Sequence, residues 1–260
     1  MSVAVAPVTD EQLRQWDEDG YTVVRGRFNL ADMTAARAEA DRLMTRTDLM
    51  DTKNLRCRWQ PNVVTGESCQ FECFDPVIDI SPLCASLAYD PRLLAVLAKL
   101  YREPACLFKD KLIFKPPGAK GYALHQDWIG WPGFPRSFLT VLVPFDRAGA
   151  DNGATEVFTG YHHNGSLSPE DGDYHELSTD LVDEGRGVIL ELEPGDVAIF
   201  GGFVPHQSAP NRSDRWRRQL YLSYNKESDG GPQRAKHYAE FHAWLVKKYA
   251  QYGKIETHFA

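Results

Sequence analysis

Residues 106–118, with the sequence CLFKDKLIFKPPG, decide the fold, because the hydrophobic period of the chain changes there. From this stretch onward the period is close to two residues, which predicts strands rather than helices. Turn residues such as Asn152-Gly153 separate the strand-like runs. Many short strands with such punctuation predict a β-sandwich or jelly roll. The expected strands span residues 106–115, 122–128, 138–145, 154–158, 187–192, 196–200, 203–208 and 216–225.

The chain before residue 105 is predicted to be mainly helical. Thr9 and Gln12 form a capping-box signature that opens a short helix, which Gly20 ends. Asp90 followed by Pro91 opens another helix. Further expected elements are a helix at 29–47, strands at 21–24 and 68–74, an irregular segment at 48–67 and a last helix at about 233–250. We therefore expect one domain over residues 1–260, with a helical part at about 1–104, a β core at about 105–226 and a C-terminal helix.

The composition restricts the class of protein. The 260 residues carry a formal net charge of −7, from 29 Lys and Arg against 36 Asp and Glu. This acidic balance argues against a nucleic-acid partner, which needs a basic surface. No run approaches the roughly 20 apolar residues of a membrane span, and the first seven residues lack a secretory signal. The five cysteines contain no CxxC pair, so we expect a cytoplasmic protein, monomeric or homodimeric, with reduced thiols.

Two short motifs suggest a metal centre. His125 and Asp127 are two residues apart in an expected strand, so their side chains point to the same face. His206, on a later strand, would complete a set of two imidazoles and one carboxylate, which is typical of non-haem Fe(II) oxygenases. Arg217 follows in an apolar strand, where a guanidinium needs an anionic partner. A carboxylate of 2-oxoglutarate would be such a partner.

These motifs together resemble the phytanoyl-CoA dioxygenase family of Fe(II)/2-oxoglutarate oxygenases. The matching pieces, in family order, are Lys115–Gly118, His125–Asp127, Asp151–Gly153, Gly165–Leu167, Gly195–Val197 and His206–Ser208, followed by Asn211 and Arg217. The resemblance implies a double-stranded β-helix core, that is, a cupin-like jelly roll. It also implies that His125, Asp127 and His206 bind iron, and that Arg217 binds the distal carboxylate of 2-oxoglutarate.

The resemblance implies three further contacts to the cosubstrate. Trp131 matches an aromatic residue that contacts it in the related ectoine hydroxylases, and Lys111 lies roughly where the family has a residue touching it. Thr140, on a core strand, could donate a hydrogen bond to it. The parity of their strand places Lys109, Lys111 and Lys115 on one face, for which a solvated edge is an equal alternative.

The resemblance predicts a hydroxylase that uses Fe(II), 2-oxoglutarate and O2 and releases succinate and CO2. Asp127 stands where family-like halogenases have Ala or Gly, so halogenation is not expected. The expected substrate is a small polar metabolite, such as an amino acid, a quaternary ammonium compound or an aminophosphonate. The alternatives are a non-catalytic metal-binding jelly roll and a metalloenzyme that does not use 2-oxoglutarate. The substrate-lining segments are expected at 54–74, 128–138 and 160–185, with Arg56, Arg58, Trp59, Gln70, Glu72, Trp128, Trp131, Phe134 and Arg136 among the candidates.

Overall fold

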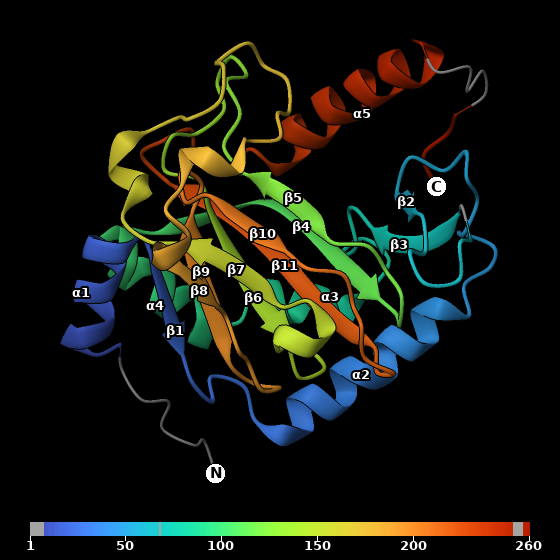
Figure 1. Ribbon diagram of the computed structural model, residues 1–260, viewed down its shortest axis with the longest axis horizontal. Helices are drawn as coiled ribbons and strands as arrows, with labels where there is room; N and C mark the ends of the chain where they lie inside the picture. Colours follow the sequence, from blue (N-terminus) through green and yellow to red (C-terminus); the bar gives the residue numbers. More distant parts are fainter. Residues whose placement is uncertain (1–7, 68, 252–256) are drawn as a thin grey trace.

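The computed structural model of the chain describes residues 8–67, 69–251 and 257–260. In these ranges two antiparallel sheets form a sandwich, with strand orders β1-β9-β6-β11-β4-β3-β2 and β5-β10-β7-β8 (Figure 1). The predicted fold class, mainly β with flanking helices around a jelly-roll core, is confirmed. The strands are β1 (Tyr21–Val24), β2 (Cys57–Gln60), β3 (Gln70–Phe74), β4 (Ala105–Lys115), β5 (Tyr122–His125), β6 (Leu139–Pro144), β7 (Thr155–Phe158), β8 (Gly187–Ile189), β9 (Val197–Gly201), β10 (His206–Ser208) and β11 (Arg217–Lys226).

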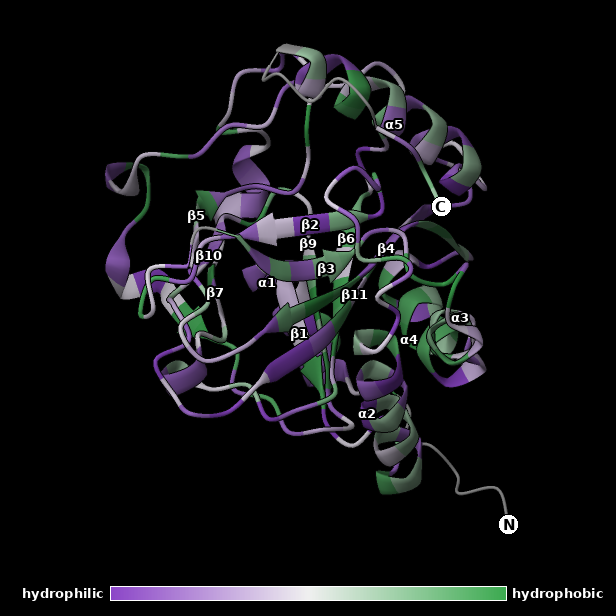
Figure 2. Cartoon of the chain, turned by 90° about the vertical axis from the view of Figure 1, so that its right-hand side faces the viewer, coloured by the Kyte–Doolittle hydropathy of each residue, from purple (hydrophilic) through white to green (hydrophobic). Residues whose placement is uncertain are grey.

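Helices cover the outer face of the larger sheet. Figure 2 shows α2, α3 and α4 on one side of this sheet and the smaller sheet on the other side. In α2, Met33, Ala36, Ala40 and Leu43 recur at helical spacing, and all four are fully buried. The helices are α1 (Asp10–Asp19), α2 (Leu30–Met44), α3 (Pro82–Ala88), α4 (Pro91–Tyr101) and α5 (Arg234–Gln251), with short 3-10 helices at Ala150–Asn152, Tyr161–Asn164, Thr179–Leu181 and Glu184–Arg186.

The alternation of β11 separates two hydrophobic cores. Leu220, Leu222 and Tyr224 belong to the cluster that includes the helices, whereas Tyr221 belongs to the cluster between the sheets, with Val157 of β7. Successive side chains of a strand point to opposite faces, so each face of the larger sheet needs its own apolar cover. Polar residues on the inner face therefore come to lie between the two sheets.

Three strands of the N-terminal part extend the larger sheet: β1 and β3 match the strands expected at 21–24 and 68–74, whereas β2 was not expected. β1 pairs with β9, so the first strand of the chain forms one edge of the larger sheet. β2 lies in the segment expected to be irregular and pairs with β3. The short helix α3 was not expected. Ser81 caps it, because its hydroxyl oxygen accepts a hydrogen bond from the backbone N–H of Cys84. This helix has fewer than two full helical turns of periodic signal.

The strands of the smaller sheet are shorter than expected. The strand predicted over 203–208 begins only at His206, since Pro205 has no backbone N–H to donate to a ladder. The strand predicted over 122–128 ends at His125. The chain then leaves the sheet, and the Gln126 side chain donates to the carbonyl oxygens of Gly165 and Phe203.

The site predicted from the sequence lies between the sheets. β5 and β10 of the smaller sheet pair so that His206 is opposite His125. The inner faces of β4 and β6 lie across the sandwich, and α5 crosses one end of it and packs against β4 (Figure 1). None of the described helices is both long enough and apolar enough to cross a membrane.

Candidate metal centre

The structure brings His125, Asp127 and His206 together. Their potential ligand atoms all lie within 4.8 Å of one another. Asp127 Oδ1 is 3.9 Å from His125 Nε2 and 3.7 Å from His206 Nε2, and the imidazole centroids are 4.2 Å apart. The three side chains therefore converge on one point, as predicted, although only His125 and His206 lie on paired strands and Asp127 follows the end of β5.

Hydrogen bonds orient both imidazoles for metal binding. His125 Nδ1 is 2.7 Å from the carbonyl oxygen of Ala123, and His206 Nδ1 is 3.0 Å from that of Val204. A carbonyl oxygen only accepts, so each Nδ1 must carry the proton, which leaves a lone pair on each Nε2. This is the arrangement in which a backbone acceptor fixes the tautomer of a metal-binding histidine.

The carboxylate is oriented in the same way. Thr140 Oγ1, on β6, donates to Asp127 Oδ2 at 2.6 Å, so Oδ1 is the oxygen that faces the two imidazoles. The hydroxyl proton of Thr140 is therefore used on Asp127. The expected contact of Thr140 is with the cosubstrate, but the structure gives it the carboxylate as its partner.

The charges in this cluster suit a cation. Burial, followed by the proximity of His206, lowers the pKa of His125 to about 3, which keeps its imidazole neutral. Burial alone would raise the pKa of Asp127, but His206 and Lys111 outweigh burial and lower it to about 2. Two imidazoles and one carboxylate are the donor set of non-haem Fe(II) sites with open positions. The residues present therefore fit Fe(II).

Arg217 lies at the start of β11 and is fully buried. Its Nη1 donates to Gln219 Oε1 at 2.6 Å, but its Nε and Nη2 have no hydrogen-bond partner among the described residues. Lys115, opposite on β4, is also fully buried. Burial, followed by the charge of Arg217, lowers the pKa of Lys115 to about 6. Unused donors on a buried guanidinium suit an anionic ligand such as a carboxylate.

The other two expected cosubstrate residues, Lys111 and Trp131, both lie at the cavities beside the triad. Lys111 lines both a small hollow behind the triad, shared with Ser208 and Tyr221, and a larger cavity in front of it. Trp131 lines only the larger cavity, and its indole nitrogen donates to the carbonyl oxygen of Gly172. Lys111 therefore lines both cavities, whereas Trp131 lines only the larger one.

The larger cavity has a volume of about 700 Å³ and opens directly onto His125 and Asp127. All three segments expected to line it contribute residues. Its charged and aromatic lining comprises Arg58, Glu72, Lys109, Lys111, Lys120, Glu176, Tyr122, Trp131, Phe134, Phe138, Tyr174, Phe241 and Trp244. The face shared by Lys109 and Lys111 is thus turned into the cavity and is not a solvated edge.

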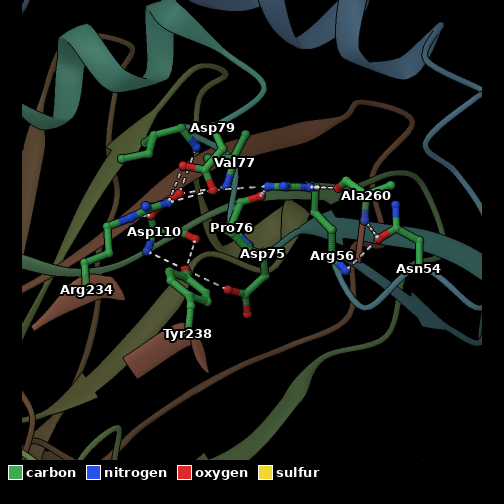
Figure 3. A network of polar contacts seen from close by, with 11 residues as sticks. Asn54, Arg56, Asp75, Pro76, Val77, Asp79, Asp110, Arg234, Tyr238 and Ala260 are labelled. Atoms are coloured by element: carbon green, nitrogen blue, oxygen red, sulfur yellow. Dashed lines mark hydrogen bonds and ion pairs between the residues drawn. The ribbon is translucent and has the colours of Figure 1, made fainter. Parts of the chain in front are cut away.

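Several candidates from the same segments lie elsewhere. Arg56 does not line the cavity, because its guanidinium donates to the carbonyl oxygens of Pro76 and Ala260 (Figure 3). The alternation of β2 turns Trp59 toward the core beneath the helices. Gln70, Trp128 and Arg136 are likewise outside the lining.

Sequence reasoning missed the contribution of α5. His237, Phe241 and Trp244 of this helix line the cavity, and Trp131 lies 6.2–6.4 Å from each of their rings, measured between centroids. Their spacing is the only available signal. It indicates an amphipathic helix but does not say whether the apolar face covers a core or a cavity.

Comparison with known proteins gives the same family as the motifs. A family model described as Phytanoyl-CoA dioxygenase (PhyH) matches residues 16–219. A 2-aminoethylphosphonate dioxygenase from uncultured bacterium HF130_AEPn_1 is 31% identical over 85% of this chain and 83% of its own length. The apo crystal structure of EctD from S. alaskensis has a TM-score of 0.72 at 22% identity, covering 90% of this chain and 85% of that one.

A second solved structure shows that the fold alone does not identify the reaction. The epimerase SnoN, solved in complex with Fe3+, alpha ketoglutarate and nogalamycin RO, has a TM-score of 0.69 at 20% identity. It covers 84% of this chain and 83% of that one. Proteins of this fold therefore include an epimerase, and the reaction has to be argued from the site itself.

Proposed function

The chain belongs to the phytanoyl-CoA dioxygenase family and is an Fe(II)/2-oxoglutarate-dependent dioxygenase, and on this premise we propose that His125, Asp127 and His206 hold the iron. The observation that carries the proposal is the convergence of their three ligand atoms within 4.8 Å. The Nδ1 contacts of both imidazoles support it, because they leave each Nε2 free to bind a metal.

Arg217 is proposed to bind the distal carboxylate of 2-oxoglutarate. Its Nε and Nη2 lack partners among the described residues, and a guanidinium can hold a carboxylate through two parallel hydrogen bonds. Lys111, which lines the hollow behind the triad, is proposed to contact the same cosubstrate. Thr140 is proposed to orient Asp127, and Trp131 to shape the substrate cavity.

Iron and 2-oxoglutarate supply the oxidative chemistry that hydroxylates a substrate C–H, with O2 consumed and succinate and CO2 released. The protein's residues position the reactants and keep water away from them. Thr140 keeps one oxygen of Asp127 occupied, so that the other faces the imidazoles. Trp131, Phe241 and Trp244 form an apolar wall of the substrate cavity, which excludes water and limits the orientations of a bound molecule.

The proposed substrate is a small polar metabolite that carries both charges, as an aminophosphonate or an amino acid does. The cavity wall combines cations, Arg58 and Lys109, with the carboxylates of Glu72 and Glu176. The name of the 2-aminoethylphosphonate dioxygenase, the relative that covers 85% of this chain, points to the same class. A volume of about 700 Å³ is ample for such a molecule.

A decarboxylation screen tests this proposal. The protein is incubated with Fe(II), ascorbate, 2-oxoglutarate and small amino, ammonium and phosphonate compounds, and succinate is measured. Mass spectrometry of products formed in chloride buffer under labelled dioxygen should show a new hydroxyl and no chlorine, because Asp127 occupies the position that halide would take. Absence of succinate with every compound would favour a non-catalytic metal-binding protein. Turnover without 2-oxoglutarate would favour a different metalloenzyme.

We also propose a cytoplasmic monomer or homodimer that binds no nucleic acid. All five cysteines are free thiols in the structure, as a reducing compartment would leave them. The formal charge of −7 would repel a phosphate backbone.

A further inference from the structure

Positive charge lines the floor of the large cavity beyond the triad. Lys109 and Lys111 share the inner face of β4. Lys109 precedes Lys111 by two residues, or about 7 Å along the strand. Burial lowers the pKa of Lys111, but the negative charge of nearby Asp127 helps to raise it above its ordinary value. Arg58, from β2, stands beside Lys109 and lines the same cavity. Two cations therefore lie close together at one end of the cavity.

One carboxylate forms ion pairs with both cations. Asp75 Oδ2 is 3.1 Å from Lys109 Nζ and 3.8 Å from Arg58 Nη2. Asp75 is held from the other side, because the Tyr238 hydroxyl donates to its Oδ1 at 3.0 Å (Figure 3). Arg58 and Lys109 therefore share one carboxylate as their ion-pair partner.

Arg58 also has a hydrogen-bond donor that the described part of the chain does not use. Its Nη1 donates to the carbonyl oxygens of Leu55 and Cys57. Its Nη2 is buried and has no hydrogen-bond partner among the residues that the structure describes. A buried guanidinium nitrogen without a hydrogen-bond partner is costly, and an anionic oxygen closer than that of Asp75 would satisfy it best.

The aromatic wall at this end does not suit a cationic ligand. Phe241 already has Lys109 Nζ at 4.2 Å and Arg58 Cζ at 5.3 Å from its ring centroid, and Trp244 has Lys248 Nζ at 5.3 Å. These rings interact with the protein's own cations, which would repel a substrate ammonium group placed among them.

We propose that Arg58 and Lys109 form a subsite for the anionic head group of the substrate, a phosphonate or a carboxylate. The proposal rests on the proposed function, which places the reacting C–H at the triad. The head group would sit beside Phe241, and Ser223, which pairs with Lys109 across β11 and β4, forms the adjacent floor. The distance of about 7 Å along β4 between Lys109 and Lys111 suits a small substrate. The subsite thereby sets which end of the substrate faces the iron.

Anaerobic calorimetry of the Fe(II)- and 2-oxoglutarate-loaded protein tests the subsite. The probes are methylphosphonate, propionate and propylammonium, in a buffer free of phosphate. We expect the anions to bind and propylammonium not to bind. The affinities of the two anions for the native protein distinguish a phosphonate site from a carboxylate site.

Two kinds of variant separate charge from folding. Lys109→Met should weaken anion binding at least about 10-fold, a difference of about 1.4 kcal/mol. Ser223→Asp keeps both cations but adds an internal carboxylate, and it should weaken anion binding by a similar factor relative to the isosteric Ser223→Asn. Lys226→Met is the matched control, because Lys226 pairs with Glu103 on the same sheet but does not line the cavity. Loading with iron and 2-oxoglutarate, followed by absorption spectroscopy, should be native in all four.

The outcomes distinguish this proposal from the proposed function. Equal anion affinity in Lys109→Met and Lys226→Met, together with equal affinity in the two Ser223 variants, would overturn the subsite even if succinate is formed. Tighter binding of propylammonium than of either anion would also overturn it. Absence of succinate with every substrate would reject the hydroxylase, while the titrations would still report on the anion site.

Discussion

Removal of the Thr140 hydroxyl is expected to weaken iron binding without removing a metal ligand. Thr140 Oγ1 donates to Asp127 Oδ2 at 2.6 Å, and Thr140 is 1% exposed. Thr140→Val replaces the hydroxyl by a methyl group of similar size, so the packing changes little. The carboxylate oxygen then loses its donor and the orientation that the donor imposes.

The magnitude follows from the type of hydrogen bond. A hydrogen bond to a charged group contributes about 1.5–3 kcal/mol, and each factor of 10 in affinity corresponds to about 1.4 kcal/mol. Loss of such a partner of a metal ligand typically lowers metal affinity about 10- to 100-fold. We therefore expect Thr140→Val to bind Fe(II) about 10- to 100-fold more weakly than the native protein.

An anaerobic competition titration of Fe(II) against a fluorescent chelator measures this effect. Thr140→Ser is the control, because it keeps the hydroxyl and loses only the methyl group. We expect Thr140→Ser to remain within about 3-fold of native affinity, a difference of less than about 0.7 kcal/mol. Native affinity in Thr140→Val would refute the assigned role of the hydroxyl. Equal losses in the two variants would show that packing, rather than the hydrogen bond, is responsible.

Three further perturbations address the triad, the cosubstrate site and the buried lysine. His206→Ala should abolish Fe(II) binding in the same titration, and native affinity would contradict its role as a ligand. Arg217→Lys should raise the KM for 2-oxoglutarate while Fe(II) affinity is kept. Arg218→Lys should leave that KM unchanged, since Arg218 faces Asp146 on the other side of the sheet. A raised KM in Arg218→Lys but not in Arg217→Lys would mean that the side chains of β11 are assigned to the wrong faces of the sheet. Burial holds the pKa of Lys115 at about 6 against an ordinary value of 10.5, so the unfolded chain binds more protons between these values. The free energy of unfolding, relative to that of Lys115→Met, should therefore rise with pH by up to about 1.4 kcal/mol per unit in this window. Urea denaturation at several pH values measures the slope, and a constant difference would show that Lys115 is charged in the folded protein.

The core of the candidate site was predicted from strand parity, which places residues two apart on one face. The prediction that His125 and Asp127 lie together is right, but β5 ends at His125, and Asp127 follows beyond the strand with its carboxylate oriented by Thr140. Only His206 required a prediction of strand neighbours, and the motif order of the family supplied it. The tautomers were not predictable, since they depend on backbone carbonyl oxygens whose positions no side-chain pattern encodes.

The supporting residues were harder to predict because they come from distant segments. The partner of Arg58 is Asp75, on the loop that follows β3. The aromatic wall comes from α5, more than a hundred residues after Trp131. An amphipathic helix has the same sequence period whether its apolar face covers a packed core or a cavity. Thr140 was assigned to the site, but its hydrogen bond to Asp127 was not predicted. The alternation of a strand indicates which face a side chain is on and not which group it contacts.

The outer face of the larger sheet also determines the geometry of the site on its inner face. Leu112 and Leu220 are fully buried beneath the helices, and they pair with each other across β4 and β11. A slip of one residue in β11 would turn Leu220 inward and exchange Arg217 for Arg218 between the sheets. Full burial of a leucine side chain contributes about 1.5–3 kcal/mol, so several such residues make the slipped register strongly unfavourable. The hydrophobic contacts with the helices, which touch neither iron nor substrate, therefore keep the guanidinium of Arg217 on the side of the sheet where the triad lies.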